Sequence, residues 1–341
     1  MEYPTKPRPG SRVAVISPSA GLPAIFPEVF ELGLRRMRED FKLEPVEFPT
    51  TRVLGASPAD RARDVMAAFT DPTIDAVVAT IGGDDQLRIL RHLDPAALRA
   101  HPKPFFGYSD NTTLLNYLSG LGIVGYHGAS VLVQLGRAGA MHPLTHDSLE
   151  AALFRPGWFD LTPSPDYTDE PVDWHTPDYA NAEQAMFASP GWRWHGPSAS
   201  VTGRLWGGNI EVLTWLLASD VVAPPPADAV FFMETSEDMP PAIEVYYMLR
   251  NLGERGWLTN VPAILVGRAK CWDRLNRLAP DAKRAYAEDQ RAAVLRAAGE
   301  YAPEALVVLD LDIGHTDPQQ ILPYGGEVTI DAATRRISVR Y

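Results

Sequence analysis

The sequences DAVVATIGGDD at residues 75–85 and PFFGYSDNTT at residues 104–113 decide the fold. Each begins with a short apolar run, continues into a turn, and is followed by a stretch with helical periodicity. The same alternation extends outward, with further apolar runs at residues 13–16, 46–48 and 123–126. Short strands that alternate with amphipathic helices predict a parallel sheet covered by helices on both faces.

The remainder of the chain divides into two parts. Residues 154–200 are rich in Pro, Asp and Tyr and show no sustained period, which is typical of a functional lid or a linker. Four of the chain's 8 tryptophans lie there, and this aromatic content argues against disorder: Trp158, Trp174, Trp192 and Trp194. Beyond residue 200, strands and helices resume and end in a hairpin at 327–340. We predict two α/β domains: a flavodoxin-like parallel sheet with helices on both faces at 1–153, a lid or linker at 154–200, and a mixed α/β domain at 201–341.

Composition narrows the classes of partner. The 341 residues include 31 basic and 43 acidic side chains, so the net charge is −12, which disfavours nucleic acid and anionic membrane surfaces. The N-terminal stretch lacks the apolar segment of a secretory signal, and no run approaches the roughly 18 apolar residues of a membrane span. Cys271 is the single cysteine, which excludes an intrachain disulfide. We therefore expect a cytoplasmic protein in which Cys271 is a buried apolar filler.

No nucleotide cofactor or metal is expected. Pro-Ser-Ala-Gly at 18–21 follows the first strand, where a dinucleotide-binding fold has G-x-G-x-x-G. His142 and His146 have the spacing of a zinc pair, but Pro143 separates them and no Glu occupies the position that zinc peptidases use. The sequence therefore predicts chemistry performed by side chains and backbone groups.

Ser109 is the candidate nucleophile. It stands at the apex of a turn between a strand and a helix, where free N–H groups of the helix N-terminus favour an oxyanion. The usual nucleophile elbow has Gly two residues on each side of the Ser, whereas here Gly107 precedes Ser109 and Asn111 follows it. The pattern is equally typical of a helix that Ser109 or Asp110 caps.

A nucleophilic Ser needs a neighbouring base and an acid that orients the base. His315, on a Gly-containing loop after a buried strand, is a natural general base, and His127, which follows another strand, is its competitor. Glu234 ends the apolar run AVFFME, although Glu237 and Asp238 could equally begin the next turn. Spacing alone does not show that these groups meet.

Taken together, seven motifs in this order resemble those of the LD-carboxypeptidase family of serine peptidases, over nearly the whole chain. They are GSRVAVISPS at 10–19, RARD at 61–64, IGGDD at 81–85, GYSDNT at 107–112, GRLWGGN at 203–209, FME at 232–234 and GHTDPQQILP at 314–323. The resemblance implies a metal-free triad, with Ser109 as nucleophile, Glu234 as orienting acid and His315 as base.

On that assignment the oxyanion is expected to lie on backbone N–H groups of Asp110 and Gly83, because glycines allow close approach. The candidate substrate-binding residues are Gly82, Asp84, Trp192, Trp194, Arg204 and Asn209. Arg204 is the candidate to bind a substrate carboxylate. A lid Trp could stack on a nucleobase, or Trp192 and Trp194 could only pack the lid onto the scaffold.

Within the family, the long middle segment and YTDEPVDW at 167–174 resemble the microcin C immunity (MccF-like) branch. Its members hydrolyse an amide in peptidyl or aminoacyl nucleotide analogues such as sulfamoyl adenylates. A branch with shorter loops releases D-alanine from murein tetrapeptides during peptidoglycan recycling, and this is the alternative function. The resemblance implies a homodimer that acts on a small peptide or peptidyl-nucleotide substrate. An alternative of another class is an inactive protein that sequesters its ligand in the same cleft.

Overall fold

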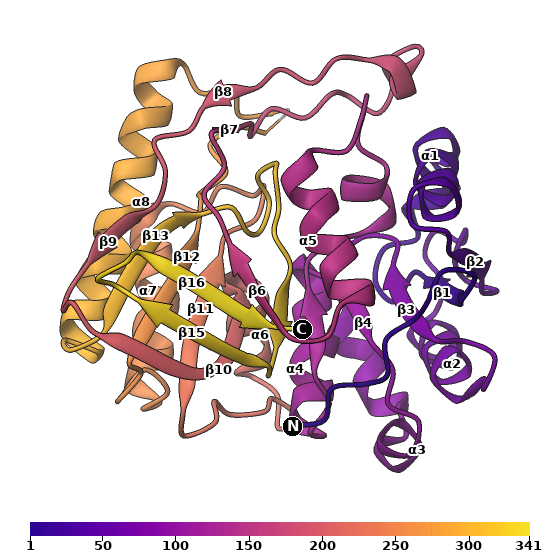
Figure 1. The fold of residues 1–341 in the computed structure, drawn as a ribbon, viewed down its shortest axis with the longest axis horizontal. Helices are drawn as coiled ribbons and strands as arrows, with labels where there is room; N and C mark the ends of the chain where they lie inside the picture. The colour runs from indigo at the N-terminus through magenta and orange to yellow at the C-terminus, as the bar shows by residue number, and fades with distance from the viewer. Residues whose placement is uncertain (274) are drawn as a thin grey trace.

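A computed structural model describes residues 1–273 and 275–341. It has two mixed-topology halves, and Figure 1 shows them side by side, the N-terminal half in indigo to magenta and the C-terminal half in orange to yellow. Each half is built on its own sheet, and the α/β class is confirmed. No helix in the described ranges is long and apolar enough to span a bilayer.

The first sheet has six strands in the order β14-β5-β4-β3-β1-β2. Its strands are β1 (Arg12–Ile16), β2 (Glu44–Glu47), β3 (Ala76–Ala79), β4 (Phe105–Gly107), β5 (Gly125–His127) and β14 (Leu322–Tyr324). The first five are mutually parallel, as predicted. Every residue of β3 and β4 is buried. Because both faces of such strands are covered, their sequences are continuous apolar runs.

Helices connect the strands of this half. They are α1 (Pro27–Glu39), α2 (Pro58–Thr70), α3 (Pro95–Ala100), α4 (Thr112–Gly120) and α5 (Pro143–Phe154). The start of α2 is fixed by Ser57, whose side chain accepts a hydrogen bond from the Asp60 N–H, and by Pro58 in the first turn. The helix predicted after the Gly82-Gly83 turn is instead a 3-10 helix over Gln86–His92.

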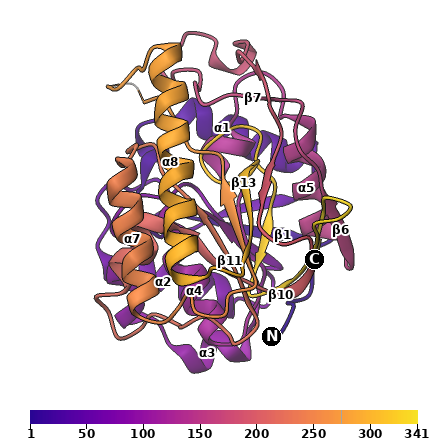
Figure 2. The same cartoon turned by 90° about the vertical axis from the view of Figure 1, so that its left-hand side faces the viewer.

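The second sheet has eight strands in the order β6-β16-β15-β10-β11-β12-β13-β9. Its strands are β6 (Trp158–Leu161), β9 (Arg193–His195), β10 (Ser200–Asn209), β11 (Ala229–Glu234), β12 (Ala263–Gly267), β13 (Leu306–Leu311), β15 (Glu327–Asp331) and β16 (Arg336–Arg340). The central four, β10 to β13, are parallel, and β15 with β16 forms the predicted hairpin. Three helices accompany this sheet: α6 (Ile210–Leu216), α7 (Ala242–Glu254) and α8 (Pro280–Tyr301). The last two pack side by side (Figure 2).

The segment predicted as a lid or linker is partly built into the second sheet. β6 pairs with β16 at one edge, and β9 pairs with β13 at the opposite edge. Between them the chain crosses the top of the molecule through the short pair β7 (Asp166–Tyr167) and β8 (Phe187–Ala188), as Figure 1 shows. Strands β16 and β13 would otherwise leave their outer backbone N–H and C=O groups unpaired, and β6 and β9 form hydrogen bonds with these groups. The division of the chain at residues 153 and 200 stays a prediction.

One C-terminal strand returns to the first sheet. β14 pairs antiparallel with β5, with Leu322 opposite His127. The chain therefore leaves the second sheet at the end of β13 and enters the first sheet at β14. Residues 312–321, which include His315, must bridge the two halves.

Candidate active site

A cavity of about 420 Å³ lies beyond the carboxyl ends of the parallel strands. Ser109, after β4, and His315, after β13, both line it, together with Gly82 and Gly83 after β3. Parallel sheets place ligands at this edge, because the loops that follow neighbouring strands converge there. The structure therefore brings the predicted nucleophile and base into one cavity.

Ser109 adopts a strained backbone conformation. Its φ is 61°, in the left-handed region that residues other than glycine rarely occupy. Gly82 approaches it so closely that a Cβ built on Gly82 would lie 2.9 Å from Ser109 Oγ and 3.2 Å from the Asp110 N atom. A strained Ser between a strand and a helix is the geometry of a nucleophile elbow, and it presents the hydroxyl to the cavity.

Glu234 and His315 form a buried pair. Glu234 Oε2 lies 2.5 Å from His315 Nδ1, and the two side chains are 0% and 7% exposed. Burial alone opposes protonation of the imidazole, but the charge and hydrogen bond of Glu234, with a further contribution from Glu237, raise the pKa of His315 to about 9. The carboxylate faces the ring nitrogen that an orienting acid contacts, and leaves Nε2 on the other side of the ring.

The Nε2 atom of His315 faces a second carboxylate. Glu237 Oε2 lies 3.3 Å from it, and the Tyr108 ring packs edge-on against the imidazole with 4.9 Å between centroids. Within the described ranges no hydrogen bond joins Ser109 Oγ to His315. Catalytic hydrogen bonds of this kind often form only when substrate binds.

Gln319 attaches the His315 loop to the N-terminal half. Its side-chain oxygen accepts a hydrogen bond from the Ala129 N–H at 2.7 Å, and its amide nitrogen donates to the Gly314 carbonyl at 2.6 Å. The Gln319 N–H donates to Thr145 Oγ1 in α5 at 2.8 Å. One buried side chain therefore fixes the residue before His315 against the half that carries the nucleophile.

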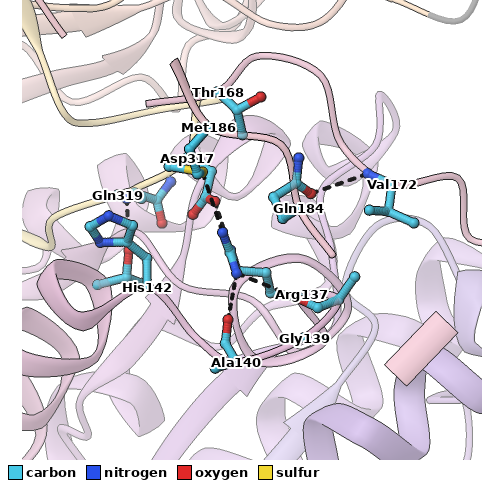
Figure 3. Close-up of polar contacts among 12 residues, drawn as sticks. Arg137, Gly139, Ala140, His142, Thr168, Val172, Gln184, Met186, Asp317 and Gln319 are labelled. Atoms are coloured by element: carbon cyan, nitrogen blue, oxygen red, sulfur yellow. Dashed lines mark hydrogen bonds and ion pairs between the residues drawn. The ribbon is translucent and has the colours of Figure 1, made fainter. Parts of the chain in front are cut away.

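Asp317 makes a second attachment, which Figure 3 shows. Its carboxylate accepts a hydrogen bond from Arg137 Nε at 2.7 Å, and its backbone pairs with Thr168 of the crossing segment at 2.7 and 2.9 Å. Arg137 also donates to the Ala140 carbonyl and approaches Met186 Sδ at 3.5 Å. Three separate parts of the chain are held together around the base.

The Asp110 carboxylate ties together the turns behind the nucleophile. It accepts hydrogen bonds from the Gln86 N–H at 2.8 Å and from the Ser19 hydroxyl, and burial raises its pKa. Gly83, which lies against Ser19, lines the cavity. The backbone groups of Gly83 and Asp110 are thus near Ser109, and their role as oxyanion donors stays a prediction.

Three predicted substrate-binding side chains lie away from the cavity, and we correct their placement. Trp192 donates its indole N–H to Asp312 at 2.9 Å, and Trp194 lies in β9, paired with Val308 of β13. They pack the segment onto the sheet edge. Arg204 pairs with Asp228 at the middle of β10, roughly 16 Å of strand from Asn209.

Two other predicted substrate-binding residues, Asn209 and Asp84, lie near the site without lining the cavity, whereas Gly82 lines it. Asn209 is buried, stands opposite Glu234 in the register of β10 and β11, and caps α6 by accepting a hydrogen bond from Val212. Asp84 is exposed beyond the Gly82-Gly83 turn. The competing base, His127, is fully buried with Nε2 3.9 Å from Glu234 Oε1, and burial lowers its pKa to about 4.

Cys271 is buried, as expected. It is 7% exposed, its thiol donates to the Ala269 carbonyl at 3.3 Å, and burial raises its pKa to about 12. A thiol with that pKa is a poor nucleophile.

Several lining residues were missed from the sequence. Trp174 of the crossing segment lines the cavity, as do Glu237, Arg137 and the Lys270 and Trp272 pair that follows β12. Ligands bind at the carboxyl ends of parallel strands, and this rule led to the candidates after β4 and β13. The same rule applied to β12 would have identified Lys270 and Trp272. Trp174 belongs to the Trp-rich segment, but nothing in the sequence separates it from its aromatic neighbours.

Comparison with known proteins gives consistent matches. Residues 13–128 match the model of the LD-carboxypeptidase N-terminal domain, and residues 202–330 match that of the C-terminal domain. The chain is 28% identical over 284 residues to the microcin C7 self-immunity protein MccF of Escherichia coli, covering 82% of this chain and 78% of that protein.

Solved structures agree over nearly the whole length. An MccF-like protein from Streptococcus pneumoniae in complex with AMP has a TM-score of 0.85 and 25% identity, covering 97% of this chain and 99% of that chain. A structure of MccF in complex with glutamyl sulfamoyl guanosine has a TM-score of 0.84 and 23% identity, covering 99% and 98%. The two-domain α/β architecture is shared.

Proposed function

Because this chain belongs to the LD-carboxypeptidase family, we propose that it is a serine hydrolase that cleaves an amide bond with Ser109, His315 and Glu234. The observation that carries the proposal is that Ser109, with its strained backbone, and His315, paired with the buried Glu234, line one cavity. A hydroxyl, an imidazole and a carboxylate are the residue types of a catalytic triad, and the contact of Glu234 with Nδ1 of His315 supports this proposal.

The proposed reaction begins with attack of Ser109 Oγ on the amide carbonyl carbon, while His315 Nε2 takes the hydroxyl proton. Backbone N–H groups of Gly83 and Asp110 would stabilise the oxyanion of the tetrahedral intermediate. The intermediate collapses to an acyl-enzyme when His315 returns the proton to the leaving nitrogen. Water, deprotonated by His315, then releases the acid and restores Ser109. Glu234 holds the ring tautomer throughout.

For the substrate we propose an aminoacyl or peptidyl nucleotide analogue. The cavity volume suits a ligand of that size. Trp174, Trp272 and Phe26 line it, with Phe26 and Trp174 packed edge-on at 4.7 Å, and aromatic faces of this kind stack on bases. The AMP complex of the S. pneumoniae relative and the glutamyl sulfamoyl guanosine complex of MccF support this class.

A murein tetrapeptide is the second candidate, and one residue favours it. Lys270 lines the cavity, is 9% exposed, and its ammonium has a long hydrogen bond of 3.4 Å to the His315 carbonyl. Burial lowers the pKa of this ammonium. Glu237 is the carboxylate that acts most strongly on this ammonium, and a terminal substrate carboxylate would add a direct ion pair.

Mass spectrometry separates these candidates. The wild-type protein and Ser109→Ala are each incubated with an aminoacyl sulfamoyl adenosine and with murein tetrapeptide. We expect the wild type alone to release the sulfamoyl nucleoside. Release of D-alanine alone would replace the proposed substrate with the murein peptide. Equal activity in Ser109→Ala would reject the serine mechanism, and binding of either compound without cleavage would indicate a sequestering protein.

A further inference from the structure

Glu237 is an acid in the cavity that the proposed triad does not use. It lies three residues beyond Glu234, on the loop after β11, and lines the cavity. Its side chain is 56% exposed, whereas Glu234 is 0% exposed. The two carboxylates therefore differ in availability: Glu234 is fixed behind the imidazole, and Glu237 is free to meet a ligand.

Glu237 contacts the nitrogen that has to do the chemistry. Its Oε2 atom is 3.3 Å from His315 Nε2, which in the proposed reaction faces Ser109 and the leaving nitrogen. Among the described residues, His315 is the ion-pair partner of Glu237, and no Lys or Arg lies within ion-pair distance of it. Substrate must take the place of this contact, and the Glu237 carboxylate then becomes available to a positively charged group of the substrate.

The position of Glu237 limits which substrate group could be that partner. The base must approach both Ser109 Oγ and the leaving nitrogen at about 3 Å, so the scissile carbonyl lies beside Nε2. A carboxylate 3.3 Å from Nε2 is therefore within reach of substituents on the carbon next to that carbonyl. In an aminoacyl compound this carbon carries an ammonium group, whereas in peptidyl and murein substrates the same nitrogen is acylated and neutral.

We propose that Glu237 binds the α-ammonium group of an aminoacyl substrate and so selects free amino acid amides over N-acylated ones. The inference rests on the proposed function and narrows its substrate class. When the ammonium pairs with Glu237, the carboxylate leaves Nε2, and the imidazole becomes free to accept the Ser109 proton. Binding of the α-ammonium group therefore also frees His315 Nε2 to act as the base.

The other charged groups around His315 do not offer the same role. Glu234 is committed to Nδ1, and Lys270 is itself a cation, bound to the His315 carbonyl. Asp238 is exposed and close enough to Glu237 for their charges to interact, which helps raise the pKa of Asp238 after the effect of burial. Asp238 does not line the cavity, which makes it a matched control for loss of one negative charge.

The experiment uses two probes that react with a nucleophilic Ser. A 1-aminoalkyl diphenyl phosphonate with a free amine and its N-acetyl derivative each phosphonylate Ser109: the Oγ–P bond forms, one phenolate leaves, and the hydroxyl proton ends on phenol. Intact-mass spectrometry gives the rate constant for each probe. The quantity compared is the ratio of the free-amine rate to the N-acetyl rate, in the wild type, Glu237→Gln and Asp238→Asn.

We expect this ratio to fall about tenfold in Glu237→Gln, as for loss of a partly exposed charge pair, and to stay near the wild-type value in Asp238→Asn. Reaction with the N-acetyl probe should be as fast or faster in Glu237→Gln, because Nε2 is no longer occupied. If both probes modify Ser109 and the ratio of their rate constants is the same in Glu237→Gln and in the wild type, the role of Glu237 is overturned while the proposed serine mechanism stands. An equal fall in Asp238→Asn would also overturn this role. Failure of both probes to modify Ser109 in the wild type would overturn the proposed function, and this inference with it.

Discussion

The two halves of the molecule build their shares of the site in different ways. In the N-terminal half, Ser109 is positioned by its own left-handed backbone and by Gly82. In the C-terminal half, Glu234 and His315 are 81 residues apart, and their meeting depends on the loop that Gln319 and Asp317 attach to the other half of the molecule. The nucleophile is a local structure, whereas the base is the product of long-range packing.

The strongest test of the local side is Ser109→Ala. Turnover should fall by on the order of 10⁴–10⁶, because the attacking oxygen is gone while Cβ and the backbone conformation stay. Hydrolysis of an aminoacyl sulfamoyl adenosine and the thermal unfolding midpoint are measured together. Residual activity near that of the wild type would show that the elbow is not the reactive centre.

The long-range side is tested next by Glu234→Gln, which keeps the size of the buried side chain. We expect a loss of roughly 10⁴ in kcat, because a neutral amide no longer stabilises the imidazolium or fixes the tautomer with a proton on Nδ1. The kcat of this variant is compared with that of Asn209→Ala, which removes a buried neighbour of Glu234 but leaves the carboxylate. An equal loss in both variants would assign the effect to packing.

The pH dependence of kcat/KM gives a second test of the Glu234–His315 pair. The pKa of His315 is raised from 6.5 to about 9, so kcat/KM should rise roughly 50-fold between pH 7 and pH 9 as the base loses its proton. Because the pKa of His315 is higher in the folded protein than in the unfolded chain, the folded protein binds this proton more tightly. The stability from the Glu234–His315 pair should therefore be fully present below pH 6.5 and be lost as pH rises through 9.

Chemical denaturation at several pH values checks this sign, with His315→Gln as the control that lacks the titrating group. In that variant the decrease in the free energy of unfolding between pH 6.5 and pH 9 should become smaller. A kcat/KM profile that is flat from pH 6 to pH 9 would contradict the assignment of His315 as the base.

A smaller effect is expected where the crossing segment meets the base. Asp317→Asn and Arg137→Met should each lower kcat about tenfold and reduce stability, because each leaves one charge of the pair without its partner. The double variant should be no worse than the more damaging single variant, as coupled residues require. Additive losses in kcat would indicate that the two side chains act independently.

The smallest expected effect returns to the elbow. Ser109→Gly should raise the free energy of unfolding by about 1 kcal/mol relative to Ser109→Ala, since glycine occupies a φ of 61° without strain. Both variants lack the hydroxyl, so the comparison isolates the backbone. Equal unfolding midpoints would mean that the left-handed conformation stores no strain.

The same difference explains what the sequence could predict. The strands of the parallel sheet, the hairpin and the elbow at Ser109 follow from local patterns, so these predictions agree with the structure. The pairing of β9 with β13 and of β14 with β5 joins residues far apart in the chain, and no local pattern encodes it. For that reason the sequence left open whether Trp192 and Trp194 bind substrate or pack the lid onto the scaffold, and the structure places them at a sheet edge.

The contact of Glu237 with His315 illustrates the same limit at the site itself. The sequence presented Glu234 and Glu237 as similar acids after a buried strand, and the resemblance to a family selected the first. Their separate functions depend on which nitrogen of the imidazole each one faces, which only the path of residues 312–321 determines.

The placement of β6 and β9 has a consequence for protein engineering. These two strands, from one segment, are the two edge strands of the eight-stranded sheet, next to β16 and β13. Shortening the segment so that β6 and β9 are lost would expose the backbone of β16 and β13 along their lengths. Bare edges of this kind recruit strands from other molecules, so the shortened protein should aggregate before any altered selectivity could be measured. Redesign of the part of the cavity that this segment lines should therefore replace side chains between β7 and β8 and leave β6 and β9 intact.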